Sequence, residues 1–211
     1  MDLQTVDKLL TTTRSVRHRL DLMRSVEPEI IAECLEIAIQ APTASNRQNW
    51  QFVVIVDADK RAQVSAYYKQ SFDLYIGGAR QANVDNAQTN RVLDSAVYLS
   101  ENMHRVPVLI IPCAEGRVET GSQQSQAGFY GAILPSTWSL MLALRARGLG
   151  SAWTTLHLRY EKEVAQVLGI PDNVTQAALL PVAYFTGEDF KPAKRRPAQE
   201  VTYWDGWGNR R

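Results

Sequence analysis

The segment from Ser125 to Arg147 is the longest helical pattern in the chain, and its apolar residues lie on nearly every side of the helix. They are Phe129, Tyr130, Ile133, Leu134, Trp138, Leu140, Met141, Leu142 and Leu144. A helix that is apolar all round must be buried, either in a large core or between subunits. Because 211 residues provide one sizeable core, we expect this helix in the interface of a homodimer. Pro135 should kink it or mark its true start.

Helical and strand patterns alternate through the rest of the chain, which we expect to form one domain over residues 1–211. The patterns predict helices over residues 3–10, 28–40, 60–77, 86–102 and 160–168, and strands over residues 52–56, 106–111, 151–156 and 177–185. The continuous apolar run at 52–56 indicates a strand buried on both faces. Pro181 cannot donate to a sheet ladder, so the last strand should be an edge or contain a bulge.

Composition excludes several classes of function. The net charge of +1 argues against a nucleic-acid surface. Cys34 and Cys113 are too few for a disulfide framework or a zinc site, and as buried thiols they favour a reducing, cytoplasmic location. His18, His104 and His157 lack metal-binding spacing, so we expect no metal. The N-terminus has no signal pattern and no apolar run reaches about 18 residues, so we expect no membrane span.

Two basic clusters are candidate anion sites. Of the 23 Lys and Arg residues 17 are Arg, whose planar fork suits phosphate and carboxylate. Arg14 and Arg17 flank Ser15, and one backbone turn could aim both guanidinium groups and the hydroxyl at a single phosphate. The alternative is a solvated helix end. Lys194, Arg195 and Arg196 form the second cluster, for which the alternative is a basic tail.

The polar connection at residues 41–50 is longer than its two apolar neighbours require. Thr43, Ser45, Asn46 and Gln48 can each donate and accept hydrogen bonds, which suits a ligand with a flat polar edge. A capped connector is the equally weighted alternative. No phosphate loop, zinc-protease or serine-hydrolase motif is present, and the glycines of residues 148–150 fit a tight turn rather than a dinucleotide site. Any chemistry therefore belongs to a bound organic cofactor.

In their order and spacing these motifs resemble the FMN-dependent nitroreductase family, over about residues 10–207. The family's phosphate clamp, basic-Ser-x-basic, matches Arg14, Ser15 and Arg17. Its Pro-Ser/Thr-x-x-Asn-x-Gln-x-Trp loop matches Pro42, Thr43, Asn46, Gln48 and Trp50, with Ala44 inside it. Its Gly-Leu-Gly turn leads to a strand end that touches the flavin ring, here Trp153, Thr154 and Thr155. A late basic-Arg-Pro segment returns to the phosphate, here Arg195 with Arg196.

The resemblance implies an α+β fold, a mixed sandwich with a central, mostly antiparallel sheet flanked by helices. It implies a homodimer with shared FMN sites, to which the loop at 42–48 contributes from the partner subunit. The tail at 191–211 is expected to extend onto the partner subunit. The implied activity is a cytoplasmic flavoprotein oxidoreductase that uses NADH or NADPH and a small-molecule electron acceptor, such as a nitroaromatic or a quinone, by ping-pong kinetics. Flavin N5 would carry the chemistry, so no side chain is named as catalytic.

Two features qualify the resemblance. Many members carry Gly-Gly or Glu-Gly where this chain has Thr154 and Thr155. That pair is similar to the branch that performs reductive dehalogenation and flavin fragmentation, and a Thr155 hydroxyl donating to N5 would favour one-electron steps. Good strand propensity is the simpler explanation of the pair.

Four aromatic residues occupy the family's substrate-lid segment, where they are equally expected as core: Tyr67, Tyr68, Phe72 and Tyr75. A non-catalytic flavin-binding or sensing protein is the remaining alternative.

Overall fold

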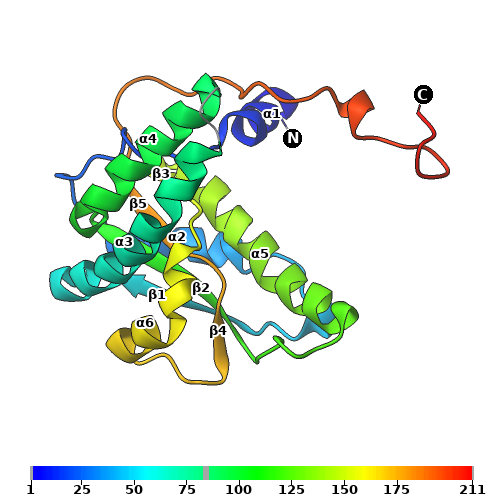
Figure 1. Cartoon of the computed structure of the whole chain (residues 1–211). Helices are drawn as coiled ribbons and strands as arrows, with labels where there is room; N and C mark the ends of the chain where they lie inside the picture. Colours follow the sequence, from blue (N-terminus) through cyan, green and yellow to red (C-terminus); the bar gives the residue numbers. More distant parts are fainter. Residues whose placement is uncertain (1, 83–85, 211) are drawn as a thin grey trace. The chain divides into compact units, whose positions relative to one another are not determined.

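The computed structural model describes residues 2–82 and 86–210 (Figure 1). The helices are α1 (Leu3–Thr12), α2 (Pro28–Ala38), α3 (Ala58–Gln81), α4 (Ala87–Asn102), α5 (Gln123–Ala146) and α6 (Glu161–Leu168), with 3-10 turns η1 (Ala44–Asn46), η2 (Met103–Arg105), η3 (Leu156–Tyr160) and η4 (Ala198–Glu200). The strands are β1 (Trp50–Ile55), β2 (Val108–Glu115), β3 (Leu149–Ser151), β4 (Val174–Gln176) and β5 (Leu180–Tyr184). The chain forms two compact units, Arg14–Gly187 and a smaller one from both ends. The assignment of residues 1–211 to one domain stays a prediction.

The sheet lies in the larger unit, and all of its pairings are antiparallel. The strand order is β1-β2-β5-β3, and β4 pairs with the far end of β2. Every residue of β2 except Glu115 is buried, as its apolar sequence predicts. The expected α+β fold with a central antiparallel sheet flanked by helices is confirmed.

Helices α2 and α5 pack on one face of the sheet. Val108 and Ile110 of β2 share a buried cluster with Leu140 and Leu144 of α5, because alternate strand residues point to the same face. The hydroxyl of Ser136 donates to the Ala38 carbonyl oxygen at 2.8 Å, which satisfies a buried carbonyl near the end of α2. Helix α3 contacts α4 and α6 and forms a second helical group with them (Figure 1).

Local chemistry explains where the long helices begin and end. The Asp57 side chain accepts from the Lys60 amide at the start of α3, and the Ser122 side chain accepts from the Ser125 amide at the start of α5. Helix α6 ends at Gly169, whose φ of +70° is the left-handed conformation that glycine adopts without strain. These caps place the helix boundaries within a few residues of the sequence prediction.

Four expectations were wrong in detail. The segment at 52–56 is not buried on both faces: most of it forms the edge strand β1, and Val54 is exposed because it points to the opposite face of the sheet from the buried Ile55. Val56, just beyond the strand, is also exposed. Strand β5 lies inside the sheet, and Pro181 is tolerated because β3 begins to pair only at Val182. Strand β3 is shorter and earlier than the predicted 151–156. Of the two alternatives predicted for Pro135, that it marks the start of the helix is wrong, because α5 begins at Gln123 and runs through this residue; that it kinks the helix stays a prediction. Strand β4 has no counterpart in the prediction.

The smaller unit contains α1 and the C-terminal segment. Lys8 of α1 forms an ion pair with Asp189 at 2.8 Å. In the tail, the rings of Tyr203 and Trp207 lie 4.5 Å apart, and the Arg210 guanidinium lies over Tyr203. Trp207 remains almost fully exposed. That these aromatic residues pack on a partner subunit stays a prediction.

Candidate functional site

A cavity of about 340 Å³ brings three of the predicted groups together. We name it the Arg17 cavity. Its lining consists of Arg17, Tyr68, Phe72, Tyr75, Val92, Leu93, Ala96, Trp153, Thr154, Thr155 and Leu156. Arg17 is the charged residue of this lining, and the other members are mainly aromatic and aliphatic. A mainly apolar cavity with one fixed cation suits a flat ring that carries an anionic group.

The clamp segment is fixed at the edge of the sheet. The Val16 amide donates to the Ser151 carbonyl oxygen at 2.9 Å, and the Asp21 amide donates to the Tyr184 carbonyl oxygen at 2.7 Å. Val16 is buried, whereas Arg14 and Ser15 are exposed. Arg17 is half-buried, and its Nη1 donates to the Ser95 hydroxyl of α4 at 3.4 Å. Burial lowers the pKa of Arg17, but a guanidinium stays charged at neutral pH.

The two threonines differ in how they are engaged. Thr154 is buried, and its hydroxyl donates to the Leu179 carbonyl oxygen at 2.7 Å. The Thr154 amide donates to the same carbonyl oxygen at 3.1 Å, so this residue is tied to the chain before β5. Thr155 is exposed and lines the Arg17 cavity. Both threonines line the Arg17 cavity, and Thr155 is the exposed one of the pair.

Three of the four lid aromatics line the cavity. Tyr68 and Phe72 are 3% exposed and their rings stack at 6.2 Å, so they belong both to the core and to the cavity wall. Tyr75 is 49% exposed at the rim. Tyr67 instead packs its ring on Tyr160 at 5.6 Å, outside the lining. Burial raises the pKa of Tyr68 to about 12, against the opposing effect of Arg17, so its hydroxyl stays protonated.

The predicted loop does not line the Arg17 cavity. It lies against α5, where a separate cavity of about 460 Å³ is lined by Ala44, Ser45, Arg47, Asn49, Val118, Gln124, Ser125, Gly128, Phe129 and Ala132. Ser45, Asn46 and Gln48 have φ values of 53°, 52° and 50°, and each costs a non-glycine residue roughly 1 kcal/mol. The Gln48 amide group donates to Asn46 Oδ1 at 2.9 Å, and the Thr43 hydroxyl accepts from the Gln48 backbone.

Arg195 and Arg196 lie in the other compact unit. Arg196 forms an ion pair with Glu200 four residues later, at 3.2 Å. The Arg195 guanidinium donates to the Lys194 carbonyl oxygen at 3.4 Å. Their role at a phosphate stays a prediction.

Sequence reasoning missed the contribution of α4 to the cavity wall. Val92, Leu93 and Ala96 line the cavity, although residues 86–102 form a mostly polar helix. These three apolar residues are separated by one and three positions, which places them on the same side of a helix. In the sequence this was a weak indication that one side of α4 faces inward.

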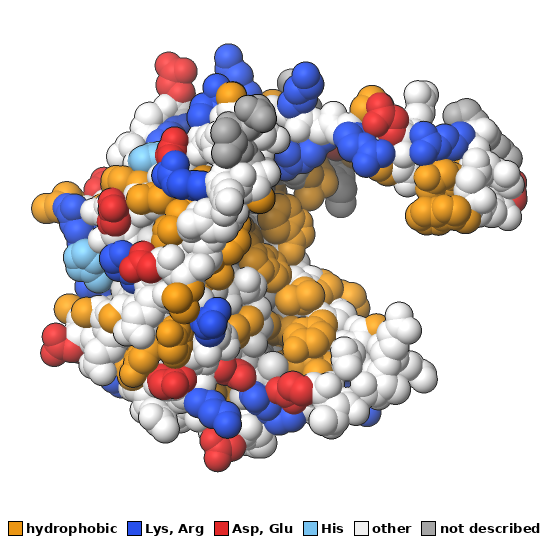
Figure 2. All heavy atoms as spheres, in the orientation of Figure 1, with side chains coloured by type: hydrophobic (Ala, Val, Ile, Leu, Met, Phe, Trp, Pro, Cys, Tyr) orange, Lys and Arg blue, Asp and Glu red, His pale blue; other side chains and the backbone are white. Residues whose placement is uncertain are grey.

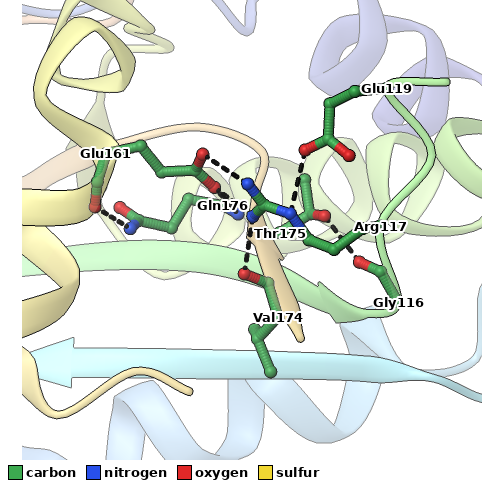
Figure 3. Close-up of polar contacts among 7 residues, drawn as sticks. All are labelled: Gly116, Arg117, Glu119, Glu161, Val174, Thr175 and Gln176. Carbon is green, nitrogen blue, oxygen red and sulfur yellow. Dashed lines mark hydrogen bonds and ion pairs between the residues drawn. The ribbon is translucent and has the colours of Figure 1, made fainter. Parts of the chain in front are cut away.

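A polar network also escaped the sequence analysis (Figure 3). Arg117 donates to both carboxylate oxygens of Glu161, at 2.8 and 3.0 Å, and pairs with Glu119 at 2.9 Å. Glu161 accepts from the Gln176 amide at 3.2 Å, which ties α6 to β4. Burial alone would raise the pKa of Glu161, but these hydrogen bonds and the Arg117 charge outweigh it and lower that pKa. The nearby cavity of about 490 Å³ shares none of the predicted site residues.

His157 lies two residues beyond the threonine pair and is completely buried. Neither of its ring nitrogens has a hydrogen-bond partner among the described residues. Burial lowers the pKa of His157 to about 4, with Glu161 acting in the opposite direction. The imidazole is therefore neutral at pH 7.

Cys34 and Cys113 are buried free thiols, as expected, and burial raises the pKa of Cys113 to about 12. Within residues 2–82 and 86–210, no group of His, Cys, Asp and Glu side chains could hold a metal ion. In that same part of the chain α5 is long and apolar enough to cross a membrane. Its Ile133, Leu140 and Leu144 are nevertheless fully buried in the protein core.

Comparison with known proteins places this geometry in a family. The model described as the nitroreductase family matches residues 10–184. An NADH dehydrogenase of Thermus thermophilus is 31% identical to this chain, with 90% of this chain and 91% of the relative covered. The FMN-dependent nitroreductase of Mycobacterium smegmatis, solved in complex with NADPH, has a TM-score of 0.70 at 20% identity, with 97% of this chain and 99% of that chain covered.

An iodotyrosine deiodinase solved with FMN and 3-iodo-L-tyrosine has a TM-score of 0.69 at 21% identity, covering 91% of this chain and 95% of that chain. At these low identities the TM-scores show that the chain shares its fold with both solved structures, and no more than its fold. The family match extends through the clamp, the loop and the threonine pair, and so covers most of the sequence. This chain belongs to the nitroreductase family.

Proposed function

We propose that the protein is an FMN-dependent oxidoreductase that uses NADH or NADPH to reduce nitroaromatics, quinones or similar electron-poor acceptors. The observation that carries the proposal is the shared lining of the Arg17 cavity, where the anion clamp and the Thr154–Thr155 strand end meet. The NADH dehydrogenase relative supports a nicotinamide as reductant. The neighbour solved with NADPH supports the same conclusion, at the level of the fold.

The residues present fit FMN. The aromatic walls of the cavity suit a flat ring system, and Arg17 supplies a half-buried cation at the same cavity. Ser15 and Arg14 stand beside it on an exposed turn, where a phosphate could be reached by two guanidinium groups and a hydroxyl. The exposed Thr155 offers a further hydrogen-bond donor in the lining of the same cavity.

Each side chain would then have a distinct task. Arg14, Arg17 and Ser15 bind the phosphate, with Arg195 as a further cation from the C-terminal segment. Thr155 donates a hydrogen bond to the ring edge, and Tyr68 with Phe72 excludes water from the ring face. When bound, FMN supplies the electron-transfer chemistry. Under this proposal the nicotinamide and the acceptor would occupy the same place beside the ring in turn, which is ping-pong behaviour.

We further propose a homodimer with shared FMN sites. Residues Ala44, Ser45 and Arg47 of the loop line a different cavity from Arg17, and no loop residue lines the Arg17 cavity of the same chain. This separation supports the proposal that the loop completes the flavin site of a partner subunit. Along α5, Gly131, Pro135 and Trp138 form an exposed stripe between buried residues. Figure 2 shows hydrophobic side chains gathered along this helix. A stripe of this kind, on the helix against which the loop lies, supports an interface between subunits.

A specialised member of the family is the second candidate. Thr155 replaces the small residue that many members carry, and its side chain lines the cavity. The likeness to the iodotyrosine deiodinase gives this candidate a precedent in the same fold. Reductive dehalogenation, a dehydrogenase reaction or flavin fragmentation would each follow from a different acceptor. A non-catalytic flavin-binding or sensing protein would bind FMN without consuming NADH or NADPH.

One experiment separates these candidates. The visible absorption spectrum of the purified protein is recorded, and NADPH is then added without oxygen. Flavin bands that bleach on mixing, and recover when a quinone or nitroaromatic is added, are the expected result. Bands that persist with both NADPH and NADH favour the specialised or sensing candidates. A protein that is colourless and does not take up added FMN would contradict the cofactor assignment.

A cytoplasmic location also stays a prediction.

A further inference from the structure

We infer that Gly150 is a positioning residue that sets the register of the anion clamp against the strand end at Thr154 and Thr155. The inference rests on the proposed function, because the clamp is taken to hold the FMN phosphate. Gly150 lies in the middle of β3, directly beneath the clamp segment. A Cβ atom at this position would lie 3.0 Å from both Cβ and Cγ1 of Val16, and 3.2 Å from Cδ2 of Leu20.

The contact matters because Val16 is the residue between Ser15 and Arg17. Its backbone amide is bonded to the Ser151 carbonyl oxygen, and its side chain is buried on β3. The absence of a side chain at Gly150 allows this close approach of two backbones. Arg17 then reaches the cavity that Thr155 also lines.

The strand cannot yield to an added methyl group as easily as the clamp can. Strand β3 is paired with β5 from Leu149 to Ser151, and beyond it Thr154 is tied to Leu179 by its amide and its hydroxyl. The backbone of residues 14–17 is held to the sheet by one hydrogen bond, from the Val16 amide to the Ser151 carbonyl oxygen, rather than by a paired strand. The segment is anchored again farther along, where Leu20 forms a bridge to Phe185 and the Asp21 amide donates to Tyr184. A Cβ atom at Gly150 would therefore push Val16 outward, and the flanking donors with it.

This displacement has a specific signature. A shift of the clamp should weaken the phosphate contacts and leave the ring contacts with Thr155 and the aromatic walls in place. Riboflavin carries the same ring as FMN and lacks the phosphate. The ratio of FMN affinity to riboflavin affinity therefore reports on the clamp alone, whereas general damage to the fold would weaken both ligands together.

The test measures dissociation constants for FMN and riboflavin by flavin fluorescence, on full-length protein freed of bound flavin. We expect Gly150→Ala to weaken FMN binding about tenfold, the loss of one charge-assisted hydrogen bond, and to change riboflavin binding less than about threefold. Gly77→Ala is the matched control, since Gly77 is exposed on α3 and an added Cβ would meet no atom within 4 Å.

A second variant covers the case in which Gly150→Ala does not fold. Val16→Ala opens a gap at the same contact and should also lower the preference for FMN over riboflavin. Unchanged preference in folded variants, or equal weakening of both ligands, would overturn the role of Gly150. Wild-type protein that binds neither flavin would instead overturn the proposed function, and this assignment with it.

Discussion

The imidazole of His157 gives this protein a pH dependence that can be worked out from its burial. The side chain is fully buried on η3, and neither ring nitrogen is hydrogen-bonded to a described residue. Burial is the main cause that lowers the pKa of His157 from 6.5 to about 4, and the Glu161 charge reduces the effect. In the unfolded chain the same ring takes a proton at its ordinary pKa. The unfolded state therefore binds more protons between these two values, and the free energy of unfolding falls as the pH falls from 6.5 toward 4.

The magnitude follows from the gap between the two pKa values. The difference between 6.5 and about 4 corresponds to roughly 3 kcal/mol once both states are fully protonated. Between pH 7 and pH 5, about 2 kcal/mol of this should be lost, since the ring is protonated in the unfolded state and still neutral in the folded state. Glu161 contributes little to the change between pH 7 and pH 5. Its pKa is lowered from 4.5, so its contribution to the free energy of unfolding is lost mainly at more acid pH.

The assay is urea unfolding of wild-type protein and His157→Phe at pH 7, 6 and 5. Phenylalanine keeps a ring in the buried site and removes the titrating nitrogens, which bond to no described residue. We expect the variant to lose about 2 kcal/mol less than wild type between pH 7 and pH 5. The same substitution at the exposed His104 controls for loss of an imidazole as such. A variant at His157 that is as steeply pH-dependent as wild type would refute the reasoning.

Three further predictions concern the site and the assembly. Arg17→Met should raise the FMN dissociation constant by about one to two powers of ten, because it removes a half-buried cation from the cavity. The control Arg80→Met breaks an exposed ion pair with Asp94 and should leave that constant unchanged. Flavin fluorescence titration measures both constants. Tyr75→Ala should change the KM for quinones and nitroaromatics, because this ring lines the cavity. It should lower the free energy of unfolding by less than about 1 kcal/mol, because the ring is half exposed. Steady-state kinetics with a series of acceptors that show no change in KM would remove Tyr75 from the acceptor site. Trp138→Glu should convert a dimer to monomers in sedimentation equilibrium, because it places a charge on the exposed stripe of α5. The control Met23→Glu, at a position 85% exposed, should leave the dimer intact. A Trp138→Glu variant that stays dimeric would place the interface elsewhere.

Local chemistry in the sequence was enough to locate most of the elements. Period-3.6 and continuous apolar patterns identified the helices and β2, because such patterns reflect which face of an element leaves water. The order of the clamp, the loop and the threonine pair identified the family, and the match over residues 10–184 confirmed it. Proline was the weakest guide. Pro181 and Pro135 lie inside a sheet and a helix respectively, where neighbouring chain geometry decides whether a missing N–H donor matters.

Tertiary structure decided which of the marked residues meet. Arg17 and Thr155 are far apart in the sequence and share one cavity because Val16 crosses β3 at Gly150. Tyr67 and Tyr68 are adjacent in the sequence, yet only Tyr68 lines that cavity, since successive residues of a helix point about 100° apart. The burial of His157 likewise depends on what packs around it. Local patterns in the amino-acid sequence were sufficient to predict most of the elements and the chemical groups they carry. The distances between those groups, and their access to water, depend on how the chain packs in three dimensions.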